Sequence, residues 1–189
     1  MKREIVKKGI TITVSGLSGT GKGTVSDALA KEFKLKKISS GDLFRKLALE
    51  KGVSLEKLSE MNTDELDHQI EKRNLELSIQ GGYVLDGRLT GLTAGSNADC
   101  RILLECSMNE KAERVARRDN FSVEESTTRL GKRDIKNSIK HARLYGTDGM
   151  DPSFYDVVID TTKMDVETTK TEAIKMVRQV LKDKGLSQL

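Results

Sequence analysis

Proline, cysteine and aromatic residues are all scarce in this chain of 189 residues, which holds one proline, two cysteines, three tyrosines, four phenylalanines and no tryptophan. So few aromatic rings offer no platform for stacking nucleic-acid bases. Two cysteines form at most one bridge, which excludes a disulfide-stapled scaffold, and no Cys or His cluster has the spacing of a zinc site. We expect Cys100 and Cys106, which share parity on a predicted strand, to be buried free thiols.

The chain also lacks a large excess of charge of one sign and long apolar runs. The chain carries 33 basic and 29 acidic side chains, and a net charge of +4 is too small for a nucleic-acid scaffold. No apolar run approaches the roughly 20 residues of a membrane-spanning helix. The charged residues 1–8 lack the apolar stretch of a signal peptide. We therefore expect a soluble, cytoplasmic monomer without a nucleic-acid or membrane partner.

Strand and helix patterns alternate along the chain. Apolar and β-branched runs predict five strands, at residues 10–15, 37–39, 83–85, 101–106 and 155–160. Apolar residues at helical spacing predict helices at residues 25–33, 43–48, 54–59, from 62 or 63 to near 81–82, 109–118, 123–145 and 166–181. Such alternation is typical of an α/β fold in which helices cover both faces of a parallel sheet. The length fits one domain.

A glycine-rich segment follows the first predicted strand directly. It fits the phosphate-binding Walker A pattern between a strand and a helix, and its residues are Gly16, Leu17, Ser18, Gly19, Thr20, Gly21, Lys22, Gly23 and Thr24. Glycines let successive N–H groups point at phosphate oxygens, the helix N-terminus adds a positive field, and Lys22 supplies a mobile charge. Thr24 can offer its hydroxyl to Mg²⁺, because Gly23 stands where the usual hydroxyl residue would be. The segment predicts nucleotide phosphate binding.

Arginines beyond two other strands predict a second anion site. Arg45 comes shortly after the second strand, and Arg88 follows the third strand in the tripeptide Asp-Gly-Arg. Ligands of parallel sheets bind at the carboxyl ends of strands, so both can face a common cleft. Further arginines recur at helical spacing, namely Arg114, Arg118, Arg129, Arg133 and Arg143. The polar residues 119–126 among them are typical of a mobile lid over a phosphoryl-transfer site.

The chain resembles the nucleoside monophosphate kinases, and more narrowly the archaeal-type cytidylate kinases, through GLSGTGKGT, SSGDLFR, LDGR and YDVVIDTT. LDGR is the narrower sign, since adenylate kinases usually place Phe-Pro between the glycine and the arginine. The resemblance implies an α/β P-loop NTPase fold, with a five-stranded parallel sheet in the order 2-3-1-4-5, flanking helices and a mobile helical lid. It also implies a single nucleoside monophosphate kinase domain over residues 1–189, with a core (9–38, 82–108, 155–189), acceptor-binding helices (39–81) and the lid (114–145).

The same resemblance implies roles for particular residues. ATP would be bound by residues 16–24 and by Arg114, with Mg²⁺ at the Thr24 hydroxyl. The acceptor nucleotide would be held by Ser40, Asp42, Arg45, Asp86 and Arg88. The transferring phosphoryl group would be stabilised by Lys22, Arg118, Arg133 and Arg143. The implied reaction is phosphoryl transfer from Mg·ATP to CMP, and also to dCMP, giving ADP and CDP.

Other functions remain open on the sequence alone. Another nucleoside monophosphate kinase, with AMP or UMP as acceptor, would carry the same phosphate loop. A nucleic-acid-associated P-loop ATPase is a weaker alternative, given the modest net charge. A GTPase-like switch is suggested by Thr162-Lys163-Met164-Asp165, which resembles the guanine-reading T-K-x-D motif. Gly23 in the hydroxyl position and the lack of a D-x-x-G motif at the expected strand end speak against it.

Overall fold

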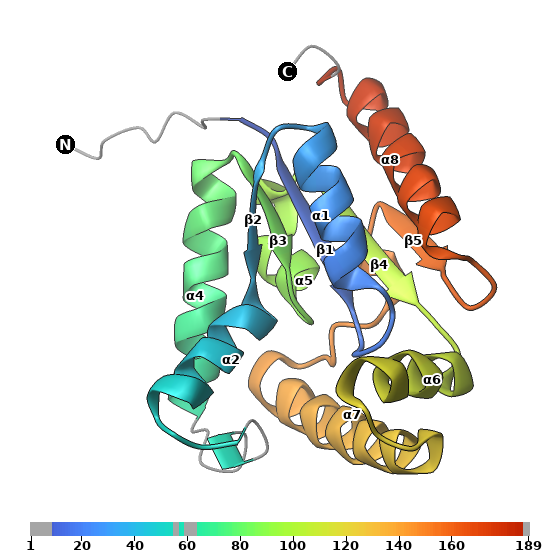
Figure 1. The fold of residues 1–189 in the computed structure, drawn as a ribbon. Helices are drawn as coiled ribbons and strands as arrows, with labels where there is room; N and C mark the ends of the chain where they lie inside the picture. Colours follow the sequence, from blue (N-terminus) through green and yellow to red (C-terminus); the bar gives the residue numbers. More distant parts are fainter. Residues whose placement is uncertain (1–8, 55–56, 59–63, 187–189) are drawn as a thin grey trace.

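The computed structural model describes residues 9–54, 57–58 and 64–186, and within them five strands alternate with helices (Figure 1). The strands are β1 (Thr11–Gly16), β2 (Lys36–Ser39), β3 (Tyr83–Asp86), β4 (Cys100–Glu105) and β5 (Val157–Asp160). The helices are α1 (Lys22–Glu32), α2 (Ser40–Glu50), α4 (Asp64–Gln80), α5 (Thr90–Ala94), α6 (Met108–Asp119), α7 (Val123–Tyr145) and α8 (Val166–Asp183), with short 3-10 helices η1 (Gly95–Asn97) and η2 (Pro152–Phe154).

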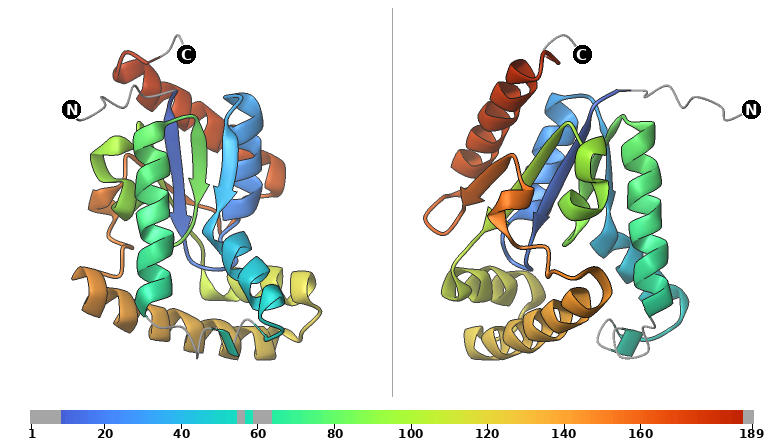
Figure 2. Two further views of the ribbon diagram at one scale, coloured as in Figure 1. Left: turned by 90° about the vertical axis from the view of Figure 1, so that its left-hand side faces the viewer. Right: turned by 180° about the vertical axis from the view of Figure 1, so that it is seen from behind.

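All the strands run parallel in one sheet, in the order β2-β3-β1-β4-β5, which confirms the expected fold class and strand order. Helices α1 and α8 cover one face of the sheet, and α4 and α5 cover the other (Figure 2). Helices α6 and α7 lie across the edge where the strands end (Figure 1). Among the described helices, none has the length and apolar character needed to cross a membrane.

Side chains of β1 alternate between two different environments. Ile12 and Val14 lie in the apolar core together with residues of α1 and α8. Thr11 and Ser15 are equally buried on alternate positions, and their hydroxyls bond the elements of the opposite face. The Ser15 hydroxyl accepts a hydrogen bond of 2.9 Å from the N–H of Gly91, which ties α5 to the strand. The central strand is thus fixed on both faces, which sets the position of the loop that follows it.

Some elements differ from the sequence prediction. Strand β4 ends at Glu105, so Cys106 lies beyond it and is only half-buried, whereas Cys100 is buried as expected. Both thiols are free, and burial raises the pKa of the Cys100 thiol to about 12. Helix α5 is too short to show helical spacing in the sequence. The predicted helix start at residue 62 or 63, and residues 55, 56 and 59 of the predicted helix 54–59, lie outside the described residues.

Candidate functional site

The phosphate loop joins β1 to α1 and turns tightly at three glycines. Gly16, Gly19 and Gly21 have φ angles of 144°, 87° and 91°, a range that side chains rarely tolerate. A Cβ atom on Gly16 would lie 2.5 Å from the carbonyl oxygen of Leu104 in β4. The backbone shape therefore requires all three glycines, and the close approach to the sheet is a second reason for a glycine at residue 16.

The first turn of α1 leaves its N–H groups available to an anion. Helices α6, α7 and α8 begin after Ser107, Ser122 and Asp165, whose side chains each accept a hydrogen bond from the first turn. Helix α1 begins after Gly21, and no side chain of the described residues caps it. A phosphate group can satisfy such donors and is attracted by the helix dipole. This end of α1 is therefore suited to hold a phosphate.

Lys22 is the first residue of α1 and bends back over the loop. Its ammonium group donates a hydrogen bond of 2.7 Å to the carbonyl oxygen of Leu17. Burial lowers the pKa of Lys22 to about 8, an effect that nearby Arg88 and Arg133 reinforce and nearby Asp86 opposes. These charges come from α1, the end of β3 and α7. The structure thus brings the predicted phosphate-loop lysine together with two of the predicted arginines.

Thr24 is the residue through which the loop could hold a metal ion. It lies partly exposed in the first turn of α1. Within the described residues, no group of three or more His, Cys, Asp or Glu side chains could bind a metal. Mg²⁺ commonly takes few protein ligands and completes its shell with water and substrate phosphates. One hydroxyl beside a phosphate-binding loop fits Mg²⁺ that arrives with a nucleotide.

The ends of β2 and β3 lie side by side, as the strand order predicts. Ser39 is in register with Asp86. A Cβ atom on Gly87 would lie 2.7 Å from the hydroxyl oxygen of Ser40, so the two strand ends are in close contact. Burial raises the pKa of the Asp86 carboxyl, and nearby Lys22 opposes this rise. These predicted acceptor residues therefore do gather at one edge of the sheet, next to the phosphate loop.

Arg45 and Asp42, predicted to contact the acceptor, form an ion pair with each other on α2. This hydrogen bond lowers the pKa of the Asp42 carboxyl. Both side chains are exposed. The guanidinium of Arg45 is therefore at the surface of the acceptor side, where an incoming anion can compete with Asp42 for it.

Arg88 lies in a buried ion-pair triad that the sequence analysis does not predict. Its Nη2 atom lies 2.9 Å from Oδ1 of Asp134 in α7, and Nζ of Lys111 in α6 lies 3.1 Å from the other carboxylate oxygen. The side chains of Arg88, Asp134 and Lys111 are 15%, 12% and 5% exposed. The triad joins the end of β3 to α6 and α7. In the sequence, Lys111 and Asp134 look like ordinary charges of solvated helices.

The remaining predicted lid arginines occupy different positions. Burial lowers the pKa of Arg133 and nearby Arg88 reinforces this, although the residue as a whole lies at an exposed position of α7. Arg118 forms two hydrogen bonds of 2.7 Å to the carboxylate of Asp119. Arg143 pairs at 2.7 Å with Asp64, at the start of α4. Arg133 thus lies near Arg88 and Lys22, while Arg118 and Arg143 are bound to acidic partners.

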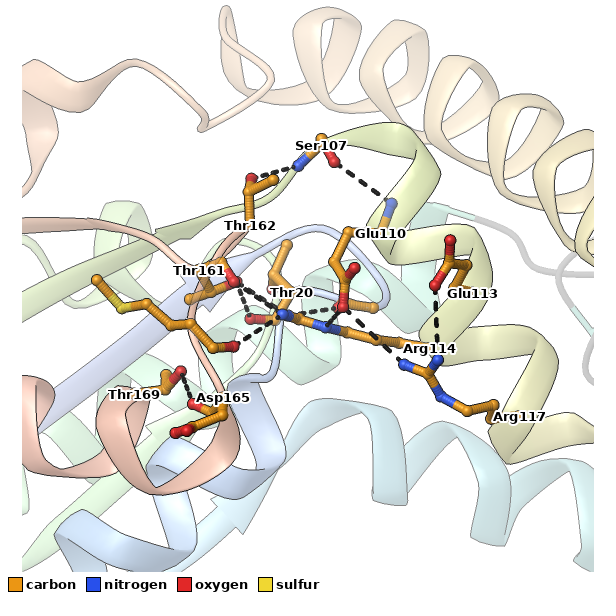
Figure 3. Close-up of polar contacts among 12 residues, drawn as sticks. Thr20, Ser107, Glu110, Glu113, Arg114, Arg117, Thr161, Thr162, Asp165 and Thr169 are labelled. Carbon is orange, nitrogen blue, oxygen red and sulfur yellow. Dashed lines mark hydrogen bonds and ion pairs between the residues drawn. The ribbon is translucent and has the colours of Figure 1, made fainter.

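Arg114 lies at the junction of α6, the phosphate loop and the segment after β5 (Figure 3). Its guanidinium donates to the hydroxyl and to the carbonyl oxygen of Thr161, a buried residue absent from the predicted site. Asp165, part of the segment that resembles a guanine-reading motif, accepts a hydrogen bond of 2.7 Å from the N–H of Thr168. Its carboxylate caps α8, which accounts for an acid at that position without a guanine ligand.

Comparison with known proteins agrees with this geometry. Residues 11–163 match the model of the cytidylate kinase-like family. Cytidylate kinase of Pyrococcus horikoshii is 40% identical over 164 residues, which cover 85% of this chain and 84% of the relative. Cytidylate kinase of Methanocaldococcus jannaschii is 34% identical over 161 residues, covering 82% and 90% of the two chains.

Two solved structures share the fold at low sequence identity. A gluconokinase from Sinorhizobium meliloti matches with a TM-score of 0.63 at 16% identity and covers 97% of this chain and 100% of its own. A shikimate kinase from Acinetobacter baumannii matches with a TM-score of 0.62 at 18% identity, covering 94% and 96%. These likenesses show the P-loop kinase fold. The family match and the relatives together show that this chain belongs to the cytidylate kinase-like family.

Proposed function

We propose that the protein transfers the terminal phosphoryl group of Mg·ATP to CMP, giving ADP and CDP, and also to dCMP, giving ADP and dCDP. The observation that carries this proposal is the grouping of Lys22 with Arg88 and Arg133. A phosphate-loop lysine beside two arginines from remote segments provides for two anions in one site. Family membership supports the choice of CMP as acceptor.

The donor phosphates would bind to the main-chain N–H groups of the loop and of the first turn of α1. Lys22 would exchange its hydrogen bond with the Leu17 carbonyl for the terminal phosphates. Mg²⁺ brought by the nucleotide, and held in part by the Thr24 hydroxyl, would neutralise charge on the phosphate oxygens. Positioned donors of this kind stabilise the charge that develops during transfer.

The acceptor phosphate would be held by Arg45 and Arg88, beside Ser40, Asp42 and Asp86. Both arginines already bind carboxylates, which occupy the sites that a phosphate would take. The attacking atom is an oxygen of the acceptor phosphate, which is ionised at neutral pH, so the reaction needs no general base. Arg118, Arg133 and Arg143 would close over the transferring group if residues 114–145 move as a lid.

The proposed reaction is tested by a coupled assay with Mg·ATP against CMP, dCMP, UMP, AMP and GMP. We expect kcat/KM to be highest for CMP, with dCMP next. A preference for AMP or UMP would keep the kinase activity and overturn the choice of acceptor. ATP hydrolysis that no acceptor changes would contradict phosphoryl transfer between nucleotides.

Nucleotide affinity should fall as the pH rises above 8. Lys22 has a pKa of about 8 in the free protein, and only its protonated form attracts phosphate. Bound phosphate stabilises that charge and raises the pKa, so binding above pH 8 requires proton uptake. We expect the Kd for ADP to increase about tenfold between pH 7 and pH 9.

Calorimetry in buffers of different ionisation enthalpy measures this proton uptake directly. Lys22→Ala is the matched control, because its weaker binding should lose most of the pH dependence over the same range. A wild-type Kd that stays constant from pH 7 to pH 9 would show that Lys22 does not titrate against the phosphates.

A further inference from the structure

The guanidinium of Arg114 donates hydrogen bonds to several groups within the protein (Figure 3). Nε donates to Glu110 at 2.8 Å, Nη1 to the Thr161 hydroxyl at 3.0 Å and Nη2 to the Thr161 carbonyl oxygen at 2.7 Å. Longer contacts reach the carbonyl oxygens of Gly19, at 3.5 Å, and Met164, at 3.4 Å. A guanidinium has five N–H donors. A nucleotide could bind Arg114 only in competition with these contacts.

Thr161 connects Arg114 to the phosphate loop. The residue is fully buried, and its hydroxyl lies 3.0 Å from the carbonyl oxygen of Glu105 and 3.1 Å from that of Thr20. A hydroxyl carries one hydrogen and two acceptor sites, so it can accept from Arg114 while it shares its single hydrogen between these two carbonyls. Valine has nearly the shape of threonine but has no hydroxyl and so cannot form these hydrogen bonds, whereas serine keeps the hydroxyl. The hydroxyl therefore joins β4, α6 and the loop at one point.

The carbonyl groups held in this way determine where the loop directs its N–H groups. In a planar trans peptide, the C=O of one residue and the N–H of the next point in opposite directions. A Gly19 carbonyl held toward Arg114 turns the Thr20 N–H away from it. A Thr20 carbonyl held toward Thr161 likewise turns the Gly21 N–H away from Thr161. These two contacts orient successive N–H groups of the loop.

Helix α6 also limits the space in which the loop can move. A Cβ atom on Gly19 would lie 2.9 Å from the carbonyl oxygen of Lys111, so the loop rests against the backbone of this helix. Arg114 extends from the next turn of α6 and bonds both the loop and the segment after β5. The loop is therefore enclosed by α6 and by Thr161.

We infer that Arg114 and Thr161 are positioning residues, which hold the phosphate loop in its phosphate-binding shape and act through its N–H groups. The inference rests on the proposed function for the identity of the ligand, the donor nucleotide. It predicts that the Thr161 hydroxyl, which is remote from solvent, controls the KM for ATP and leaves the KM for CMP unaffected.

The test compares Thr161→Val with Thr161→Ser, and Arg114→Met with Arg117→Met. Arg117 is the matched control, because it lies on the same helix with a side chain that is 67% exposed. We expect Thr161→Val and Arg114→Met each to raise the KM for Mg·ATP about tenfold, with the KM for CMP within about twofold of wild type. Thr161→Ser and Arg117→Met should behave like wild type. The double variant, which combines Arg114→Met with Thr161→Val, should raise the KM for Mg·ATP no more than the stronger single variant does, because the two residues act as a unit.

Several results would overturn the inference. One is an unchanged KM for ATP in a folded Thr161→Val variant. Another is a smaller yield of folded Thr161→Val protein whose KM values for ATP and for CMP are both unchanged. An increase in KM for Arg114→Met alone would mean that Arg114 contacts the nucleotide directly. Titration of ADP by calorimetry separates this test from the proposed function. Weaker ADP binding by Thr161→Val would support the positioning pair even if CMP proved not to be the acceptor.

Discussion

Lys22→Ala should lower kcat by about 10²–10³-fold, the effect of removing one preorganised donor that stabilises developing charge. Lys22 is the cation of the phosphate loop that lies close to both Arg88 and Arg133. Its loss removes charge from the point where donor and acceptor phosphates would meet. Steady-state kinetics with saturating Mg·ATP and CMP measure the effect.

The fold should survive this change. Lys22 contributes one hydrogen bond to Leu17 and is held with a pKa below its ordinary value, so its charged form is disfavoured in the free protein. Circular dichroism and thermal unfolding of the variant, without nucleotide, check that the protein is intact. A folded variant with wild-type turnover would show that the reaction does not take place at this loop.

Asp134→Ala should lower the free energy of unfolding by about 3 kcal/mol, because it leaves two largely buried cations, Lys111 and Arg88, without their shared carboxylate. For a chain of this length, the corresponding decrease in Tm is about 6–12 °C. Calorimetry or circular dichroism at neutral pH measures it. Lys111 should be responsible for most of the loss, since its side chain is only 5% exposed.

A surface ion pair provides the control for this experiment. Glu172 lies 3.4 Å from Lys175 on α8, and the Lys175 side chain is 74% exposed. Glu172→Ala should therefore change the free energy of unfolding by at most about 0.5 kcal/mol. If Asp134→Ala and Glu172→Ala had the same Tm, the triad would not be a buried structural link between the sheet and helices α6 and α7.

The sequence predicts those parts of the site that depend on neighbouring residues. The phosphate loop is recognised because its glycines, its lysine and its flanking elements are contiguous, and the strand order expected from the family resemblance is confirmed. Arg88 is expected near the loop because it follows a strand of the same sheet. Its guanidinium lies close enough to Lys22 to help lower the pKa of that lysine, which is consistent with this position.

The partners of these residues could not be predicted in the same way. Arg88 and Asp134 are 46 residues apart, and Arg114 and Thr161 are 47 apart, so no local pattern links them. Asp134 looks like any charge in a helix rich in charges, and only packing shows that it is buried. Arg118 and Arg143 illustrate the converse, since helical spacing cannot reveal their pairing with Asp119 and Asp64. Their roles in catalysis remain predictions.

The helix that begins at Lys22 has a consequence for the behaviour of the free protein. Because no side chain of the described residues closes this end of α1, its first turn lacks the local protection against fraying that Ser107 gives α6. A nucleotide bound as proposed would supply that protection, and ligands that bind only the folded state stabilise it by mass action. Under the proposed function, the cellular supply of nucleotide would then help to set how long each molecule escapes unfolding and proteolysis, and the substrate would complete the structure of the helix terminus.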